Sequence, residues 1–91
     1  MNLTIAGIPF DHHHYDPRGD VLYLSVGEPK AAAHGLETPE GHHVSYDDDW
    51  AVVGLTLLNV RWLLDRDGSL ILTWPPVRLD AEQLDGVLAA A

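Results

Sequence analysis

The chain has 91 residues, which suffice for one compact domain but not for two. It contains no cysteine, which excludes disulfide bonds, thiolate metal sites and cysteine nucleophiles. Fourteen Asp and Glu against five Lys and Arg give a net charge of −9, so we expect no direct binding to nucleic acid or to a membrane. No secretory signal and no apolar run of membrane-spanning length is visible, and we expect a cytoplasmic protein.

Turn signals separate short apolar segments along the whole chain. This spacing predicts a mainly β fold, α+β at most, arranged as an antiparallel meander of about five to six strands built from hairpins. One short C-terminal helix is expected to follow the strands. We interpret residues 1–91 as a single domain, with a C-terminal hairpin and helix over residues 60–91.

The first hairpin is expected to turn at residues 16–20. Asp at the first position, Pro at the second and Gly at the fourth is the order that a type I turn prefers. We predict a three-residue loop that Gly19 closes at positive φ. In that register His12 and His14 share a face with Leu22. The turn residues are Asp16, Pro17, Gly19 and Asp20.

A second hairpin is predicted in the C-terminal third of the chain. The turn residues Asp67 and Gly68 separate two apolar segments, Val60–Leu64 and Leu70–Trp74. A three-residue loop with Gly68 at positive φ gathers the apolar residues of both segments on one face, which must be buried. That face carries Val60, Trp62, Leu64, Leu70, Leu72 and Trp74.

The middle of the chain is expected to be less regular at first and then strand-forming. Residues 27–41 are rich in Pro, Gly, Glu and Ala without alternation, and we predict a mobile connection there. Residues 42–46 and 51–58 are predicted as strands. The three aspartates of residues 47–49 lack the spacing of a calcium loop and are interpreted as the solvated turn between these strands.

The C-terminal residues carry the signals of a strand end and a helix start. Pro75 and Pro76 cannot continue a central ladder and are predicted to end the last strand. Asp80 with Gln83 three residues later has the spacing of a capping box. A helix of roughly ten residues is marginal alone, so we expect it to dock on the sheet or on a partner.

Two of the predicted strands are apolar on both faces. These are Val21–Leu24 and Val52–Leu55. A single sheet layer in water needs only one apolar face, so either the sheet curls into a barrel-like shape or a second subunit covers its outer face. We favour a homodimer, with Tyr23, Trp62 and Trp74 as candidate interface residues.

Two motifs stand out in the sequence. The first is Tyr15-Asp16-Pro17-x-x-Asp20-x-Leu22-Tyr23-Leu24, and the second runs from Val44-x-Tyr46-Asp47-x-Asp49 into Val52-Val53-Gly54-Leu55. Both resemble motifs of a bacterial family known as domain of unknown function 2283, and the resemblance covers a family-like core over roughly residues 10–59. The chain departs from the family pattern at Trp50, where Gly is usual, and this leaves the turn type there open. The resemblance implies a small β-rich domain with no established activity, and an antitoxin-like role beside a partner protein.

Six histidines are the strongest compositional oddity of the chain. On a strand, His12 and His14 point to the same side about 7 Å apart, which suits a shared metal ion if a third ligand is near. His42 or His43 can supply that ligand if its strand neighbours the first. Such a site suits a divalent transition metal such as zinc, nickel, copper or ferrous iron. The alternative is that the triplet His12–His14 forms an ordinary exposed edge strand.

Two functional hypotheses follow from these observations. The leading one is a non-enzymatic, homodimeric protein-interaction module whose acidic surface or strand edge meets a basic protein partner. The other is a histidine-based metal- or small-ligand-binding protein with hydrolytic activity. The sequence offers no Ser or Lys nucleophile in a recognisable elbow or beside a base, which favours the first hypothesis and leaves no candidate catalytic residue.

Overall fold

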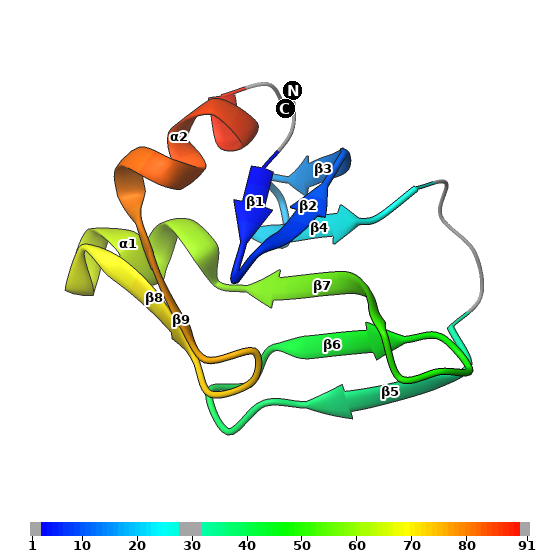
Figure 1. The fold of residues 1–91 in the computed structure, drawn as a ribbon. Coiled ribbons are helices and arrows are strands. Elements are labelled where there is room, and N and C mark those ends of the chain that lie inside the picture. The colour runs from blue at the N-terminus through cyan, green and yellow to red at the C-terminus, as the bar shows by residue number, and fades with distance from the viewer. Residues whose placement is uncertain (1–2, 28–31, 90–91) are drawn as a thin grey trace.

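The computed structural model describes residues 3–27 and 32–89, and the predicted mainly antiparallel β fold with a short C-terminal helix is confirmed (Figure 1). A second helix, which the sequence analysis did not predict, lies between two strands. The elements in chain order are β1 (Leu3–Ile5), β2 (Ile8–Phe10), β3 (His12–Asp16), β4 (Val21–Ser25), β5 (His34–Glu37), β6 (His43–Tyr46), β7 (Val52–Leu58), α1 (Val60–Asp67), β8 (Ser69–Leu72), β9 (Val77–Asp80) and α2 (Ala81–Ala89).

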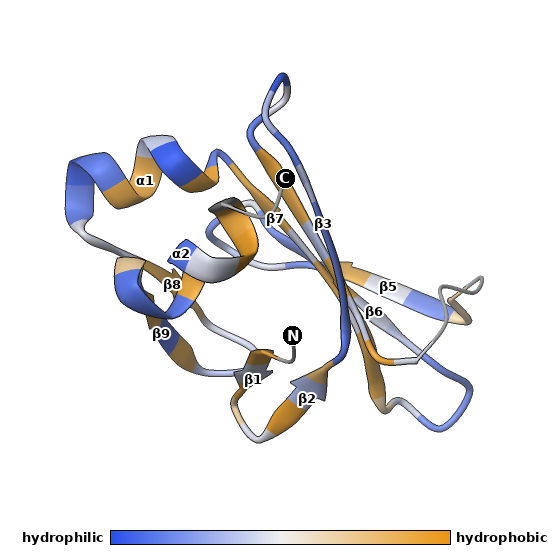
Figure 2. Cartoon of the chain, turned by 90° about the horizontal axis from the view of Figure 1, so that it is seen from above, coloured by the Kyte–Doolittle hydropathy of each residue, from blue (hydrophilic) through white to orange (hydrophobic). Residues whose placement is uncertain are grey.

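The centre of the fold is a five-stranded antiparallel sheet with the strand order β3-β4-β7-β6-β5. Two small antiparallel hairpins, β1-β2 and β8-β9, complete the strands. Figure 2 shows α1, α2 and both small hairpins on one side of the large sheet. The described helices are too short and too polar to cross a membrane.

The first hairpin forms where predicted but in a different register. Four residues separate the strands, because Asp16 pairs with Val21, and the positive φ falls at Asp20 instead of Gly19. The shift turns Tyr15 into the core and His14 outward, the reverse of the prediction. The physical reason is burial: a tyrosine ring removes more apolar surface from water than an imidazole does.

The predicted second hairpin is wrong, because its first strand is the helix α1. Val60 and Leu64 fit helical spacing as well as strand spacing, and in the helix both are buried. Gly68 takes the predicted positive φ of 77°, but it does so as the residue that ends α1, donating its N–H to the Leu64 carbonyl at 2.8 Å. Trp62 therefore does not share a strand face with Trp74.

Two further expectations need correction. The stretch 27–41 contains the edge strand β5, which pairs with β6, whereas residues 28–31 lie outside the described part of the chain. The strand predicted to run up to Pro75 and Pro76 ends earlier, at Leu72; the two prolines lie in the turn that follows, after which the chain pairs again as β9. The expected capping box is present in part, since Asp80 donates its backbone N–H to Gln83 Oε1 at 2.9 Å.

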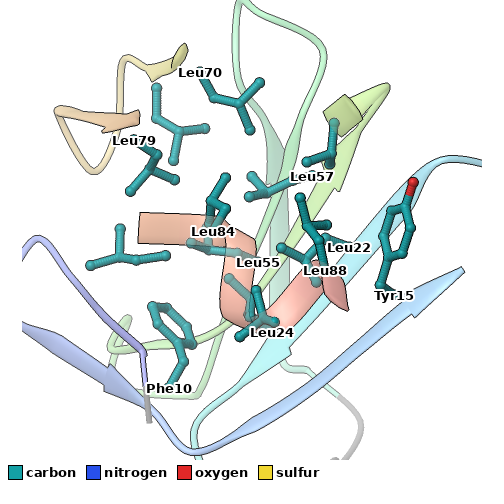
Figure 3. Packing of buried hydrophobic residues seen from close by; sticks show 14 of the residues in the cluster. Phe10, Tyr15, Leu22, Leu24, Leu55, Leu57, Leu70, Leu79, Leu84 and Leu88 are labelled. Carbon is teal, nitrogen blue, oxygen red and sulfur yellow. The ribbon is translucent and has the colours of Figure 1, made fainter. Parts of the chain in front are cut away.

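The hydrophobic core lies between one face of the large sheet and the elements packed on it (Figure 3). The sheet contributes side chains that are almost fully buried, and the opposing layer contributes residues from both helices and both small hairpins. The sheet residues are Tyr15, Leu22, Leu24, Val44, Leu55 and Leu57, and we call them the covered face. The opposing residues include Ile5, Phe10, Val60, Leu70, Leu79, Leu84 and Leu88.

Candidate functional site

The turn at residues 16–20 holds the start of α1. Asp20 accepts the backbone N–H of Arg61 at 2.9 Å and that of Trp62 at 3.1 Å, and its own carbonyl accepts the Val60 N–H at 3.2 Å. These are N–H groups that the first turn of a helix leaves without intrahelical partners. Asp20 thus caps a helix that begins forty residues later in the chain, which gives this motif residue a structural role.

The Tyr15 hydroxyl completes the Asp20 network. It donates to Asp20 Oδ1 at 2.7 Å. Burial alone raises the pKa of Asp20, but the bonds from Tyr15 and from the Arg61 and Trp62 amides outweigh it, so the pKa lies below its ordinary value. Burial, followed by the contact with Asp20, raises the pKa of Tyr15. The carboxylate is therefore held ionised at neutral pH and the phenol is held neutral.

The other turn residues have local roles. Asp16 accepts the Arg18 N–H at 3.0 Å, an Asx-type turn that Pro17 favours by its fixed φ. A Cβ at Gly19 would lie 3.4 Å from Asp16 Oδ2 and Val21 Cγ2, which is van der Waals contact, so the space around this position does not require glycine. No further chemistry follows from these contacts.

The four histidines proposed as metal ligands are not brought together. His12 and His14 lie exposed on the edge strand β3, while His43 lies on β6, and both β4 and β7 stand between these two strands. His42 is buried at the entrance to β6, with 1% of its surface exposed. Within residues 3–27 and 32–89, no three His, Asp or Glu side chains are close enough together to hold one metal ion.

His42 has a defined structural bond that fixes its tautomer. Its Nδ1 accepts the backbone N–H of Leu58 at 3.0 Å, so the proton of the neutral ring is on Nε2. The backbone N–H of His42 donates to Thr38 Oγ1 at 3.1 Å, which holds the turn before β6. Burial lowers the pKa of His42, although nearby Glu40 acts in the opposite direction. The ring is therefore kept neutral.

The second face of the large sheet has no layer packed on it among the described residues (Figure 2). Tyr23 is 45% exposed there and Leu58 is 37% exposed, whereas their strand neighbours of the covered face are buried. Alternation along the strands assigns its members. We call this set the open face; it comprises His12, His14, Asp16, Val21, Tyr23, Ser25, Gly35, Glu37, His43, Ser45, Gly54, Thr56 and Leu58.

A shallow groove of about 440 Å³ runs across the open face. Its floor is formed by small residues of β4, β7 and β6, namely Ser25, Gly54 and Ser45. The Tyr23 ring stands beside it and stacks on His14, with 6.1 Å between the ring centroids. The three small residues Ser25, Gly54 and Ser45 lie side by side on neighbouring strands. The sequence analysis could not find this row, because it is visible only once the pairing register of the strands is known.

The candidate interface aromatics lie in three different places. Tyr23 stands at the centre of the open face. Trp62 is 57% exposed on α1, where the Arg66 guanidinium lies 4.5 Å from the centre of its ring. Trp74 is half-buried against the core. Of these three residues, only Tyr23 lies on the open face.

An exposed aromatic group that the sequence analysis missed lies at the far end of β6 and β7. Trp50 takes a left-handed φ of 61°, a conformation that glycine adopts more readily than a residue with a side chain. Its indole stacks on His34 with 3.8 Å between ring centroids and also contacts Tyr46. Asp47 Oδ1 accepts the N–H groups of Asp49 and Ala51, so the acidic turn is the solvated turn predicted.

No protein-family model, curated protein or solved structure matches the chain. The resemblance to the domain of unknown function 2283 family stays a prediction that rests on the two motifs. The geometry of the site must therefore carry the functional argument alone.

Proposed function

We propose that the protein is a non-enzymatic interaction module that pairs with a second copy of itself through the open face. The observation that carries this proposal is that one sheet has two unequal faces, one packed and one bare. A sheet face that carries an exposed tyrosine, a leucine and a valine gains stability when another surface removes these groups from water.

The distribution of charged residues favours the open face as the contact between two copies. The chain has fourteen acidic residues and a net charge of −9, so two copies repel each other over most of their surfaces. The open face carries no Lys or Arg, and its only carboxylates, Asp16 and Glu37, lie near its margins. Depletion of charge around aromatic side chains is typical of the centre of a protein interface. This is the surface on which like-charged copies repel each other least.

The size of the open face sets the expected affinity. Five strands spaced about 4.8 Å apart, with about five residues of 3.3 Å each, cover roughly 400 Å² in projection. Such an area belongs to the small end of specific interfaces, below the standard of about 800 Å² for each partner. We therefore expect a reversible dimer with a dissociation constant in the micromolar range.

Sedimentation velocity of the untagged protein over a wide range of concentrations tests the proposal. We expect a monomer–dimer equilibrium for the natural chain and a monomer at every concentration for Tyr23→Glu, because a buried unpaired carboxylate at the centre of the interface is costly. The matched control is Trp62→Glu, which places the same charge on α1 and is expected to dimerise normally. A natural chain that stays monomeric, or equal effects of both variants, would contradict the proposal.

We also propose that the protein acts in the cytoplasm and that it binds a basic protein partner. A basic protein partner, and an antitoxin-like role with it, rest on the net charge and on the family resemblance, while the cytoplasm rests on the sequence features given above. A metal-binding function receives no support from the positions of His12, His14, His42 and His43. Native mass spectrometry from the natural host distinguishes these outcomes, since it reports subunit number, partner and metal together.

A further inference from the structure

A second pocket lies on the other side of the molecule from the open-face groove. Its lining includes polar side-chain atoms that make no hydrogen bond within the described residues. It has a volume of about 590 Å³ and lies between α1, β8 and the turn that precedes β6. This volume is within the range of small-molecule sites, about 300–1,000 Å³. We call it the His42 pocket; its lining is Glu40, His42, Leu63, Arg66, Asp67, Ser69, Leu70, Ile71 and Arg78.

Two buried residues direct polar atoms into this pocket. His42 is 1% exposed and Ser69 is 8% exposed, yet neither His42 Nε2 nor Ser69 Oγ takes part in a hydrogen bond within residues 3–27 and 32–89. No fully buried side-chain nitrogen or oxygen of these residues lacks a partner, so both atoms must reach solvent. The solvent space that both residues border is the pocket.

The donor of His42 is fixed before any ligand arrives. Because Nδ1 accepts the Leu58 N–H and burial keeps the ring neutral, Nε2 carries the ring's proton and can donate a hydrogen bond. Ser69 Oγ can donate as well. A pocket floor with two donors and an apolar wall of Leu63, Leu70 and Ile71 favours a ligand with an acceptor head and an apolar body.

Two of the five cationic side chains of the chain stand at the pocket. Arg66 uses its Nε and Nη2 for Asp67, and Arg78 uses its Nε for Asp80 at 3.3 Å. A guanidinium has five N–H donors, so both arginines have further donors for a ligand. The lining also contains two carboxylates: that of Asp67 is paired with Arg66, and that of Glu40 is turned to Thr73, from which it accepts two hydrogen bonds.

We propose that the His42 pocket binds a small organic carboxylate. Its carboxylate oxygens accept from His42 Nε2 and Ser69 Oγ on the floor and from the arginines Arg66 and Arg78, while its apolar part lies against Ile71 and the neighbouring leucines. Charge-assisted bonds of this kind are about twice as strong as neutral ones, which favours a carboxylate over an amide of the same shape. This site is independent of dimerisation, because it shares no residue with the open face.

Titration with benzoate, followed by ¹H–¹⁵N NMR spectra, tests the proposal, with benzamide as the neutral compound of the same shape. We expect benzoate to shift the signals of His42, Ser69 and Ile71 and to bind about tenfold more tightly than benzamide. Equal binding of the two compounds, or shifts confined to residues outside the pocket, would overturn the proposal.

A pair of double variants tests the role of the arginines. Arg66→Gln/Arg78→Gln is expected to weaken benzoate binding about tenfold or more. Arg18→Gln/Arg61→Gln removes the same charge outside the pocket and is expected to change it less than about twofold. Both pairs are exposed, so folding is preserved and can be verified in the same spectra. Similar losses in both double variants would show a general charge effect and overturn the proposed site.

Discussion

The covered and open faces belong to the same five strands and differ in every second residue. On β7, Leu57 is fully buried, while its neighbour Leu58 is 37% exposed. On β4, Leu22 and Leu24 are buried on either side of the exposed Tyr23. The covered face holds the fold together, and the open face contributes little to the stability of a single copy. A residue of the open face is therefore free to serve a contact, and substitutions there separate association from folding.

The largest expected effect is on the covered face. Leu57→Ala should lower the free energy of unfolding by about 3 kcal/mol, since it removes buried methyl groups and leaves a cavity. Leu58→Ala, one residue further along the strand, should cost less than about 1 kcal/mol in the monomer. Urea unfolding of both variants at low protein concentration measures the difference. Equal losses would show that the two faces are not distinct.

His42 links the edge of the sheet to the core, and its substitution is expected to have the next largest effect. His42→Phe keeps an aromatic ring at this position but leaves the Leu58 N–H without its acceptor, which should cost about 2 kcal/mol. The measurement is again urea unfolding, with His43→Phe as the control on the open face. A loss for His43→Phe that matches that of His42→Phe would contradict the assigned bond.

The titration of His42 predicts the sign of a pH effect on stability. Because burial lowers its pKa in the folded state, the unfolded chain binds more protons between the folded value and the ordinary value of about 6.5. Stability should therefore rise with pH through this interval: the contribution of His42 is complete above about pH 6.5 and is lost as the pH falls through the lowered value of the folded state. This slope should be absent from His42→Phe when unfolding is measured across the same pH range.

Asp20 connects the sheet to α1, and its loss is expected to cost less. Asp20→Ala removes the cap of the helix and should lower the free energy of unfolding by about 1.5 kcal/mol, whereas Asp16→Ala in the same turn should cost less. The pKa of Asp20 is lowered in the folded state, so its contribution is complete above about pH 4 and is lost as the pH falls through the lowered value. Asp20→Asn should show a weaker acid dependence.

The smallest expected effect on folding belongs to the residue with the largest expected effect on association. Tyr23→Glu should change the stability of the monomer by less than about 0.5 kcal/mol, because its ring is already 45% exposed. Thermal unfolding at low concentration provides the test. A large loss would show that Tyr23 supports the fold itself and would remove the distinction between the faces.

Sequence patterns predicted the strands well and predicted less well how they join. The strands around residues 21–25, 43–46 and 52–58 could be predicted because β-branched and apolar residues cluster between clear turn signals. The register of the first hairpin could not, because alternation alone leaves open whether Tyr15 or His14 faces the core. The helix α1 could not, because Val60 and Leu64 fit a strand as well as a helix, and the cap that Asp20 supplies comes from a distant turn.

The candidate sites show the same division. The exposure of Tyr23 on a second, uncovered sheet face could be predicted, because its strand is apolar on both faces. The groove beside it and the His42 pocket could not, since each combines residues from three or more separate segments. The histidine spacing suggested a metal site, but metal ligation requires neighbouring strands, and the strand order separates β3 from β6.

Contacts between labelled and unlabelled copies test most directly whether the open face is the interface. In an equal mixture of ¹³C-labelled and unlabelled protein, isotope-filtered NOE spectra detect only contacts between different copies. We predict such contacts from the Tyr23 ring and from the methyl groups of Val21, Thr56 and Leu58. Intermolecular contacts from Trp62 and Ile71 instead, or none at concentrations where sedimentation shows a dimer, would contradict the account.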